Sequence, residues 1–144
     1  MFTTLTPNLM VKDIRRSVAF YTDILGFSLR MAVPEDESEF PDTLKDGVTY
    51  VYAQLVYGDL EVWIQTQESL TKDIPAFAGM SPGGAVSFYG VVEDVDAAFA
   101  KLDGKVDLVK GLETTWYGMR EFYIRDPDGY ILGFATQDPD SQMG

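Results

Sequence analysis

Neither histidine nor cysteine occurs in this 144-residue sequence, which limits the chemistry that the protein could perform. Histidine is the commonest general base and metal ligand, and cysteine supplies nucleophiles, disulfides and thiolate metal sites. The functional groups that remain are carboxylates, hydroxyls, amides and aromatic rings. The absence of histidine argues against an enzyme, although it leaves catalysis by a carboxylate open.

Glu61 is the acid whose position suggests chemistry, because it lies in a strand-like run of alternating residues. Successive side chains of a strand point to opposite faces, so Glu61 shares one face with Trp63 and Gln65, and we expect that face to line a cleft. There Glu61 could attract a cationic ligand, or act as a general base if burial raised its pKa. Alternatively, Arg120 or Arg125 could neutralise its charge.

Aromatic and polar side chains are expected beside Glu61 on the cleft side of the strands. Flat aromatic rings suit planar or cationic ligands, through stacking and cation–π contacts. The same rings could instead fill a core or a dimer interface, and in the run 50–55 either alternating set could face the cleft. The expected ligand-binding residues are Asn8, Tyr52, Glu61, Trp63, Ser87, Tyr89, Trp116, Tyr123 and Arg125.

Acidic residues outnumber basic ones by 23 to 11, which gives a formal charge of −12. This charge disfavours nucleic acid and anionic membrane surfaces as partners and would attract a cationic small molecule, although it could also serve solubility alone. Residues 1–10 lack the basic and apolar regions of a signal peptide, and no apolar run is long enough to span a membrane. We therefore expect a cytoplasmic protein.

The elements that would position these residues occur twice along the chain. Asp13 and Asp94 each precede an apolar stripe at helical spacing, as N-cap residues do, and they lie 81 positions apart (94 − 13 = 81). Each half has the order strand, helix and three strands, so we predict one domain over residues 1–144 that contains two βαβββ modules. The first module covers 3–67, a linker rich in glycine and proline covers 68–84, and the second module covers 85–137.

Residue spacing also predicts the bounds of each element. In the first module we predict a strand at 3–11, a helix at 14–25 and strands at 27–33, 49–57 and 60–66. In the second we predict a strand at 86–92, a helix at 95–102 and strands at 105–109, 116–125 and 130–136. Residues 34–47 form an exposed acidic loop, which could contact a protein partner.

Several short motifs resemble those of one protein superfamily. The residues at 6–13 (TPNLMVKD), 17–21 (SVAFY) and 25–27 (LGF) resemble the opening of the glyoxalase, bleomycin-resistance and dioxygenase proteins, the vicinal oxygen chelate superfamily. The residues at 126–129 (DPDG) resemble its closing motif. The resemblance implies an α+β fold in which each βαβββ module curls a four-stranded mixed sheet around a cleft, with its helix outside. It also implies a homodimer.

Enzymes of this superfamily bind a divalent metal ion at four inward positions, which the resemblance transfers to this sequence. They fall on Thr6, Glu61, Ser87 and Gly133. Of these, Glu61 alone is a good ligand, whereas a catalytic metal site generally needs three or more oxygen or nitrogen ligands from the protein. Asn8 or Tyr123 could substitute only after a one-residue register shift, which would turn the apolar face of a strand outward. The expectation is therefore a protein with no metal and no cofactor.

Two functional hypotheses follow. The first is a metal-free small-molecule-binding protein that resembles the bleomycin-resistance branch, for which antibiotic sequestration is a possible role. The alternative is a superfamily enzyme, a lyase, isomerase or dioxygenase, with a divergent or metal-independent site that uses Glu61. The sequence names neither the ligand nor a substrate.

Overall fold

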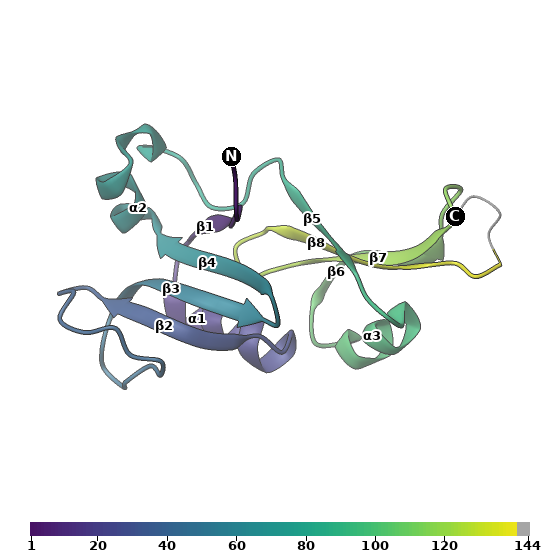
Figure 1. The fold of residues 1–144 in the computed structure, drawn as a ribbon, viewed down its shortest axis with the longest axis horizontal. Coiled ribbons are helices and arrows are strands. Elements are labelled where there is room, and N and C mark those ends of the chain that lie inside the picture. Colours follow the sequence, from purple (N-terminus) through teal and green to yellow (C-terminus); the bar gives the residue numbers. More distant parts are fainter. Residues whose placement is uncertain (141–144) are drawn as a thin grey trace. The chain divides into compact units, whose positions relative to one another are not determined.

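The structure, a computed structural model, describes residues 1–140 and forms two compact units, one over Met1–Pro82 and one that begins at Gly83. Each unit contains one four-stranded sheet, with strand order β1-β4-β3-β2 in the first and β5-β8-β7-β6 in the second (Figure 1). In both sheets the first strand of the unit pairs in parallel with the last, and the other pairs are antiparallel. The predicted α+β fold with two mixed sheets is confirmed.

The first unit follows the predicted element order. Its elements are β1 (Asn8–Val11), α1 (Ile14–Ala19), β2 (Ser28–Pro34), β3 (Tyr50–Tyr57), β4 (Leu60–Thr66) and α2 (Gln67–Asp73). β1 is shorter than the strand predicted at 3–11. Pro7 explains the late start, because proline has no N–H to donate to a strand ladder. Its carbonyl still accepts a hydrogen bond from the Trp63 N–H at 3.0 Å.

The core of the first unit lies between α1 and one face of its sheet. The Asp13 carboxylate caps α1 by accepting hydrogen bonds from the backbone of the first turn, as predicted. A π-helical turn at Phe20–Ile24 extends this helix toward Gly26, where φ is +86°. The buried apolar residues include Ile14, Val18, Tyr21, Ala53, Leu55 and Ile64. Because Ala53 and Leu55 are buried here, Tyr52 and Gln54 lie on the opposite face, which settles the alternative left open for 50–55.

A helix that the sequence did not predict follows β4. The segment 68–84 was expected to be an irregular linker, but it contains most of α2 and a 3₁₀ turn at Pro75–Phe77. Thr66 caps α2, and Leu70 anchors it with a side chain that is 2% exposed. The residues that break helices begin only at Pro75, so they end the helix without preventing it. In the described part of the chain, no helix has the length and apolar character that crossing a bilayer requires.

The second unit repeats this plan with different loops. Its elements are β5 (Ser87–Val91), α3 (Val95–Leu102), β6 (Asp107–Thr114), β7 (Met119–Arg125) and β8 (Ile131–Gln137). The predicted strands at 105–109 and 116–125 were misplaced, because the chain turns at 115–118. There the Gly118 N–H donates to the Thr115 carbonyl at 3.2 Å, and Gly118 has a φ of +82°.

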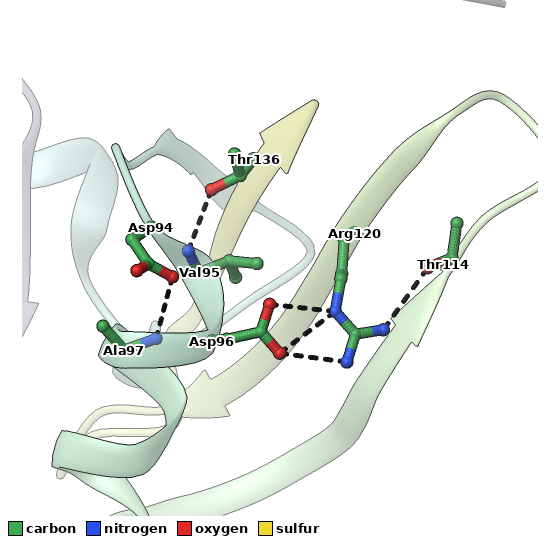
Figure 2. Close-up of polar contacts among 7 residues, drawn as sticks. All are labelled: Asp94, Val95, Asp96, Ala97, Thr114, Arg120 and Thr136. Atoms are coloured by element: carbon green, nitrogen blue, oxygen red, sulfur yellow. Dashed lines mark hydrogen bonds and ion pairs between the residues drawn. The ribbon is translucent and has the colours of Figure 1, made fainter. Parts of the chain in front are cut away.

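α3 is tied to the second sheet at its first turn. Asp94 caps the helix through the Ala97 N–H at 3.0 Å, and the Val95 N–H donates to the Thr136 hydroxyl at 2.9 Å (Figure 2). The aromatic core of the unit follows, with the ring centroids of Phe99 and Phe122 5.2 Å apart. Because Phe122 faces α3, its neighbours along β7 point to the other face of the sheet.

The acidic loop at 34–47 is largely exposed, as predicted, but its end is attached to the first unit. Arg15 of α1 donates hydrogen bonds to the carbonyls of Lys45 and Val48, and its guanidinium lies 5.3 Å from the ring centroid of Tyr50. Tyr50 in turn accepts a hydrogen bond from the Lys45 N–H at 2.9 Å. A role for this loop in contacting a partner stays a prediction.

Candidate functional site

The pairing of β1, β4 and β3 brings a polar set of side chains to the face of the first sheet that points away from α1. Asn8 pairs with Trp63, which pairs with Gln54. Two residues further along β4, Gln65 pairs with Tyr52. Residues directly opposite each other across strands share a face. We call the set formed by Asn8, Tyr52, Gln54, Glu61, Trp63 and Gln65 the polar face of the first sheet.

Hydrogen bonds join the members of this polar face into a network. The Asn8 amide donates to Gln65 at 3.0 Å, and Gln65 donates to Asp73 of α2 at 2.7 Å. On the other side of Trp63, the Gln54 amide donates to the Tyr52 hydroxyl at 2.8 Å, and the rings of Tyr52 and Trp63 meet edge to face with centroids 6.2 Å apart. The buried polar groups are therefore satisfied within the unit.

Glu61 is held by a cation that the sequence did not indicate. Arg30 of β2 forms an ion pair with the Glu61 carboxylate, and the Trp63 indole N–H donates to the same carboxylate at 3.0 Å. The hydrogen bond from Arg30, followed by that from Trp63, lowers the pKa of Glu61. The expected partners Arg120 and Arg125 are wrong, because they pair with Asp96 and Asp107.

The second sheet carries an acid that was not among the expected ligand-binding residues. Glu121 of β7 is 1% exposed, and both of its carboxylate oxygens accept hydrogen bonds from phenols. The Tyr89 hydroxyl of β5 donates to Oε2 at 2.5 Å, and the Tyr117 hydroxyl donates to Oε1. Glu61 is therefore not the only carboxylate on the face of a sheet that lies opposite its helix. We call Tyr89, Tyr117, Glu121 and Tyr123 the Glu121 cluster.

The phenols of this cluster are held in their neutral form. Burial raises the pKa of Tyr89, and the hydrogen bond to Glu121 raises it further. For Tyr117 the hydrogen bond to Glu121 is the main cause of a raised pKa, and for Tyr123 the main cause is burial, with the charge of Glu121 adding to it. At neutral pH the three tyrosines of the cluster are therefore uncharged.

The remaining predicted site residues lie at the edges of the second unit. Ser87 is exposed and pairs with Ile131 across the parallel strands. Arg125 forms an ion pair with Asp107, with 3.6 Å between Nη1 and Oδ2. Trp116 is 83% exposed at the β6–β7 turn, where its ring centroid lies 5.4 Å from that of Tyr117. Trp116 is therefore not a wall of a closed pocket within this unit.

Each unit contains a βαβββ module with one four-stranded sheet. The two modules together define an α+β protein. Residues 3–134 match the family model described as the Glyoxalase/Bleomycin resistance protein/Dioxygenase superfamily. The chain belongs to this superfamily. It is 27% identical over 138 residues to bleomycin resistance proteins of Geobacillus stearothermophilus and Staphylococcus aureus, and the match covers 91% of this chain and 94% of each relative.

Solved structures show the same fold. A protein of unknown function from Agrobacterium tumefaciens str. C58 has a TM-score of 0.70 and 26% sequence identity, with 95% of each chain covered. A glyoxalase/bleomycin resistance protein/dioxygenase from Nocardioides has a TM-score of 0.73 and 17% identity, with 100% of this chain and 89% of that chain covered. At 17% identity the likeness concerns the fold alone.

The residues of this chain do not fit the divalent metal site of the superfamily enzymes. With Asp13 and Asp94 as equivalent caps, Trp63 and Gly133 hold the same pairing position, so Glu61 and Gly133 do not lie at equivalent positions of the two units. The four expected positions hold Thr6, Glu61, Ser87 and Gly133. One carboxylate, already paired with Arg30, and two hydroxyls are a poor donor set. Over residues 1–140, no cluster of three or more acidic, histidine or cysteine side chains could hold a metal ion.

Proposed function

We propose that the protein binds a small organic molecule without a metal ion, and that its role is sequestration of an antibiotic of the bleomycin type. The observation that carries the proposal is the donor set described above, in which the one carboxylate, Glu61, already has Arg30 as its counter-ion. A catalytic metal needs several protein ligands and an open position, and these residues offer neither. The similarity to bleomycin resistance proteins supports the choice of ligand.

The side chains on the two faces support binding of a planar or cationic molecule. Tyr52 and Trp63 present aromatic rings in the first unit, and Tyr89 and Tyr123 present rings in the second, with centroids 6.4 Å apart. Aromatic faces attract both planar groups and cations. The net charge of −12 adds a long-range attraction for a cationic ligand.

The alternative of a metal-independent enzyme with Glu61 as its base has less support. A general base works best when its pKa lies near the working pH, whereas Arg30 and Trp63 lower the pKa of Glu61. Nothing else about Glu61 marks it as a reacting group. We further expect a cytoplasmic homodimer, for which sedimentation velocity at micromolar concentration is the direct measurement.

Titration of chelator-treated protein with metal-free bleomycin tests this function. We expect a saturable change in tryptophan fluorescence and a rise in melting temperature, because a ligand that binds only the folded state stabilises it. The W116F variant keeps Trp63 as its one tryptophan and should retain the fluorescence change. Unchanged fluorescence and melting temperature at saturating drug would remove bleomycin as the ligand.

A further inference from the structure

We propose that the Glu121 cluster is the subsite for a cationic nitrogen of the ligand, an ammonium or guanidinium group. The proposal deepens the proposed function by assigning the charge recognition to the second unit. It also moves that recognition away from Glu61, the acid that the sequence first suggests. Burial, hydrogen bonding and charge balance around Glu121 each contribute to the assignment.

The hydrogen bonds within the cluster leave its phenol oxygens able to accept from a ligand. The Tyr89 and Tyr117 hydroxyls both donate their protons inward to Glu121. A hydroxyl group has one proton and two lone pairs, so each phenol oxygen keeps acceptor capacity for a donor that approaches from outside. Tyr89 is 46% exposed and Tyr117 is 38% exposed, whereas Glu121 is 1% exposed. A ligand would therefore contact the tyrosines directly and interact with the carboxylate through them.

The basic side chains near Glu121 form ion pairs with other acids. Arg120, the neighbour of Glu121 along β7, is held by Asp96 of α3 through hydrogen bonds of 3.0 and 3.1 Å (Figure 2). Lys110 forms an ion pair with Glu113 at 2.6 Å, and its charge also interacts at longer range with Glu121. Within residues 1–140, no basic side chain forms an ion pair with Glu121. Glu61 differs, because it already has Arg30.

This imbalance has a physical consequence. A buried carboxylate without a direct ion pair is unfavourable, and two neutral hydroxyl donors and a more distant lysine offset only part of the lost hydration. A ligand cation placed against the two phenols would compensate the remaining charge at short range. The same site gives a neutral ligand of equal shape no such gain, so the cluster should select for charge.

Aromatic rings surround the buried acid. The rings of Tyr89 and Tyr123 are tilted by 46° to one another, and Trp116 lies beside Tyr117. A cation over the face of an aromatic ring is attracted by the electron-rich face of the π system. Rings and a buried negative charge in one place therefore favour the same ligand group.

The test compares a cationic probe with its neutral analogue, 2-phenylethylammonium with 2-phenylethanol, by ¹H–¹⁵N NMR titration of the full chain. The wild-type protein should prefer the ammonium about tenfold, which corresponds to one desolvated cation–π or charge contact. E121Q keeps the shape of the side chain but removes its charge, and its preference should fall below about twofold. The control is E93Q, which removes one exposed negative charge from the same unit and should keep the preference.

Y117F provides a second variant in case E121Q fails to fold, as judged by near-UV circular dichroism. It removes one phenol oxygen at an exposed turn and should reduce the preference several-fold. The proposal is overturned if the wild type does not discriminate, if the folded variants E121Q or Y117F discriminate as well as it does, or if E93Q loses the preference. If bleomycin binds but the ammonium is not preferred, the cation subsite is rejected and the proposed function stands. If the ammonium is preferred through Glu121 but bleomycin does not bind, only the assignment of the antibiotic is rejected.

Discussion

The ring of Tyr123 lies against Gly133 on the neighbouring strand, so closely that a Cβ built on Gly133 would come within 2.7 Å of Tyr123 Cε1. In the first unit the same pairing position holds Trp63, opposite Gln54. The two units therefore place their large ring on opposite members of an equivalent strand pair. In the second unit, β7 carries both this ring, Tyr123, and the buried acid Glu121.

Substitution of Gly133 by alanine should destabilise the protein. The added methyl group would clash with the Tyr123 ring, and overpacking of this kind costs about 1–3 kcal/mol of unfolding free energy. Urea denaturation followed by circular dichroism measures the loss. G111A is the matched control, because nothing lies within 4 Å of its added Cβ, and it should change stability by less than about 0.5 kcal/mol. Equal stability of G133A and the wild type would mean that the Tyr123 ring moves aside freely.

Removal of the cap of α3 should also lower stability. Asp94 accepts a hydrogen bond from the Ala97 N–H at 3.0 Å, and loss of such a cap costs about 1 kcal/mol. D94A should therefore shift the urea midpoint downward, whereas D94N keeps an acceptor and should lose only a few tenths of a kcal/mol. If D94N were as destabilised as D94A, the charge of Asp94 rather than its hydrogen bond would hold the helix end.

The contact between Glu61 and Trp63 gives a signal that depends on pH. The hydrogen bonds from Arg30 and Trp63 hold the pKa of Glu61 below its ordinary value of 4.5. Their contribution to the stability of the folded state is therefore present above pH 4.5 and is lost as the pH falls through the lowered pKa. In a W116F background the fluorescence of Trp63 should therefore change with a midpoint below 4.5. The change should be absent in W116F/E61Q. A midpoint at or above 4.5 would contradict an ion pair between Arg30 and Glu61.

Much of the fold could be predicted because its local signals are strong. Asp13 and Asp94 are N-caps followed by apolar stripes, and both helices begin where these residues indicate. The strand Leu60–Thr66 was predicted with its observed bounds, because its alternation is regular and Gly58 marks the turn before it. β6 was misplaced because seven of its eight residues are exposed, so its pattern carries no burial signal.

The candidate site was harder to predict, because its partners meet across strands that are distant in sequence. Arg30 lies where the register of β2 shifts, and a bulge breaks the alternation by which a face can be assigned. Tyr89 is 32 residues from Glu121, and Tyr117 lies in a turn that was predicted as strand. Glu121 was therefore not proposed for the site, because only the fold brings the phenols to its carboxylate.

The measurement that tests the central claim most directly is isothermal titration calorimetry of chelator-stripped protein with metal-free bleomycin. The account predicts saturable binding by the stripped protein, with the same affinity as the protein purified without chelators. The contradicting result is stoichiometric metal in the purified protein together with binding that disappears when this metal is removed. That outcome would require a metal ligand set that the strand pairing around Glu61 does not provide.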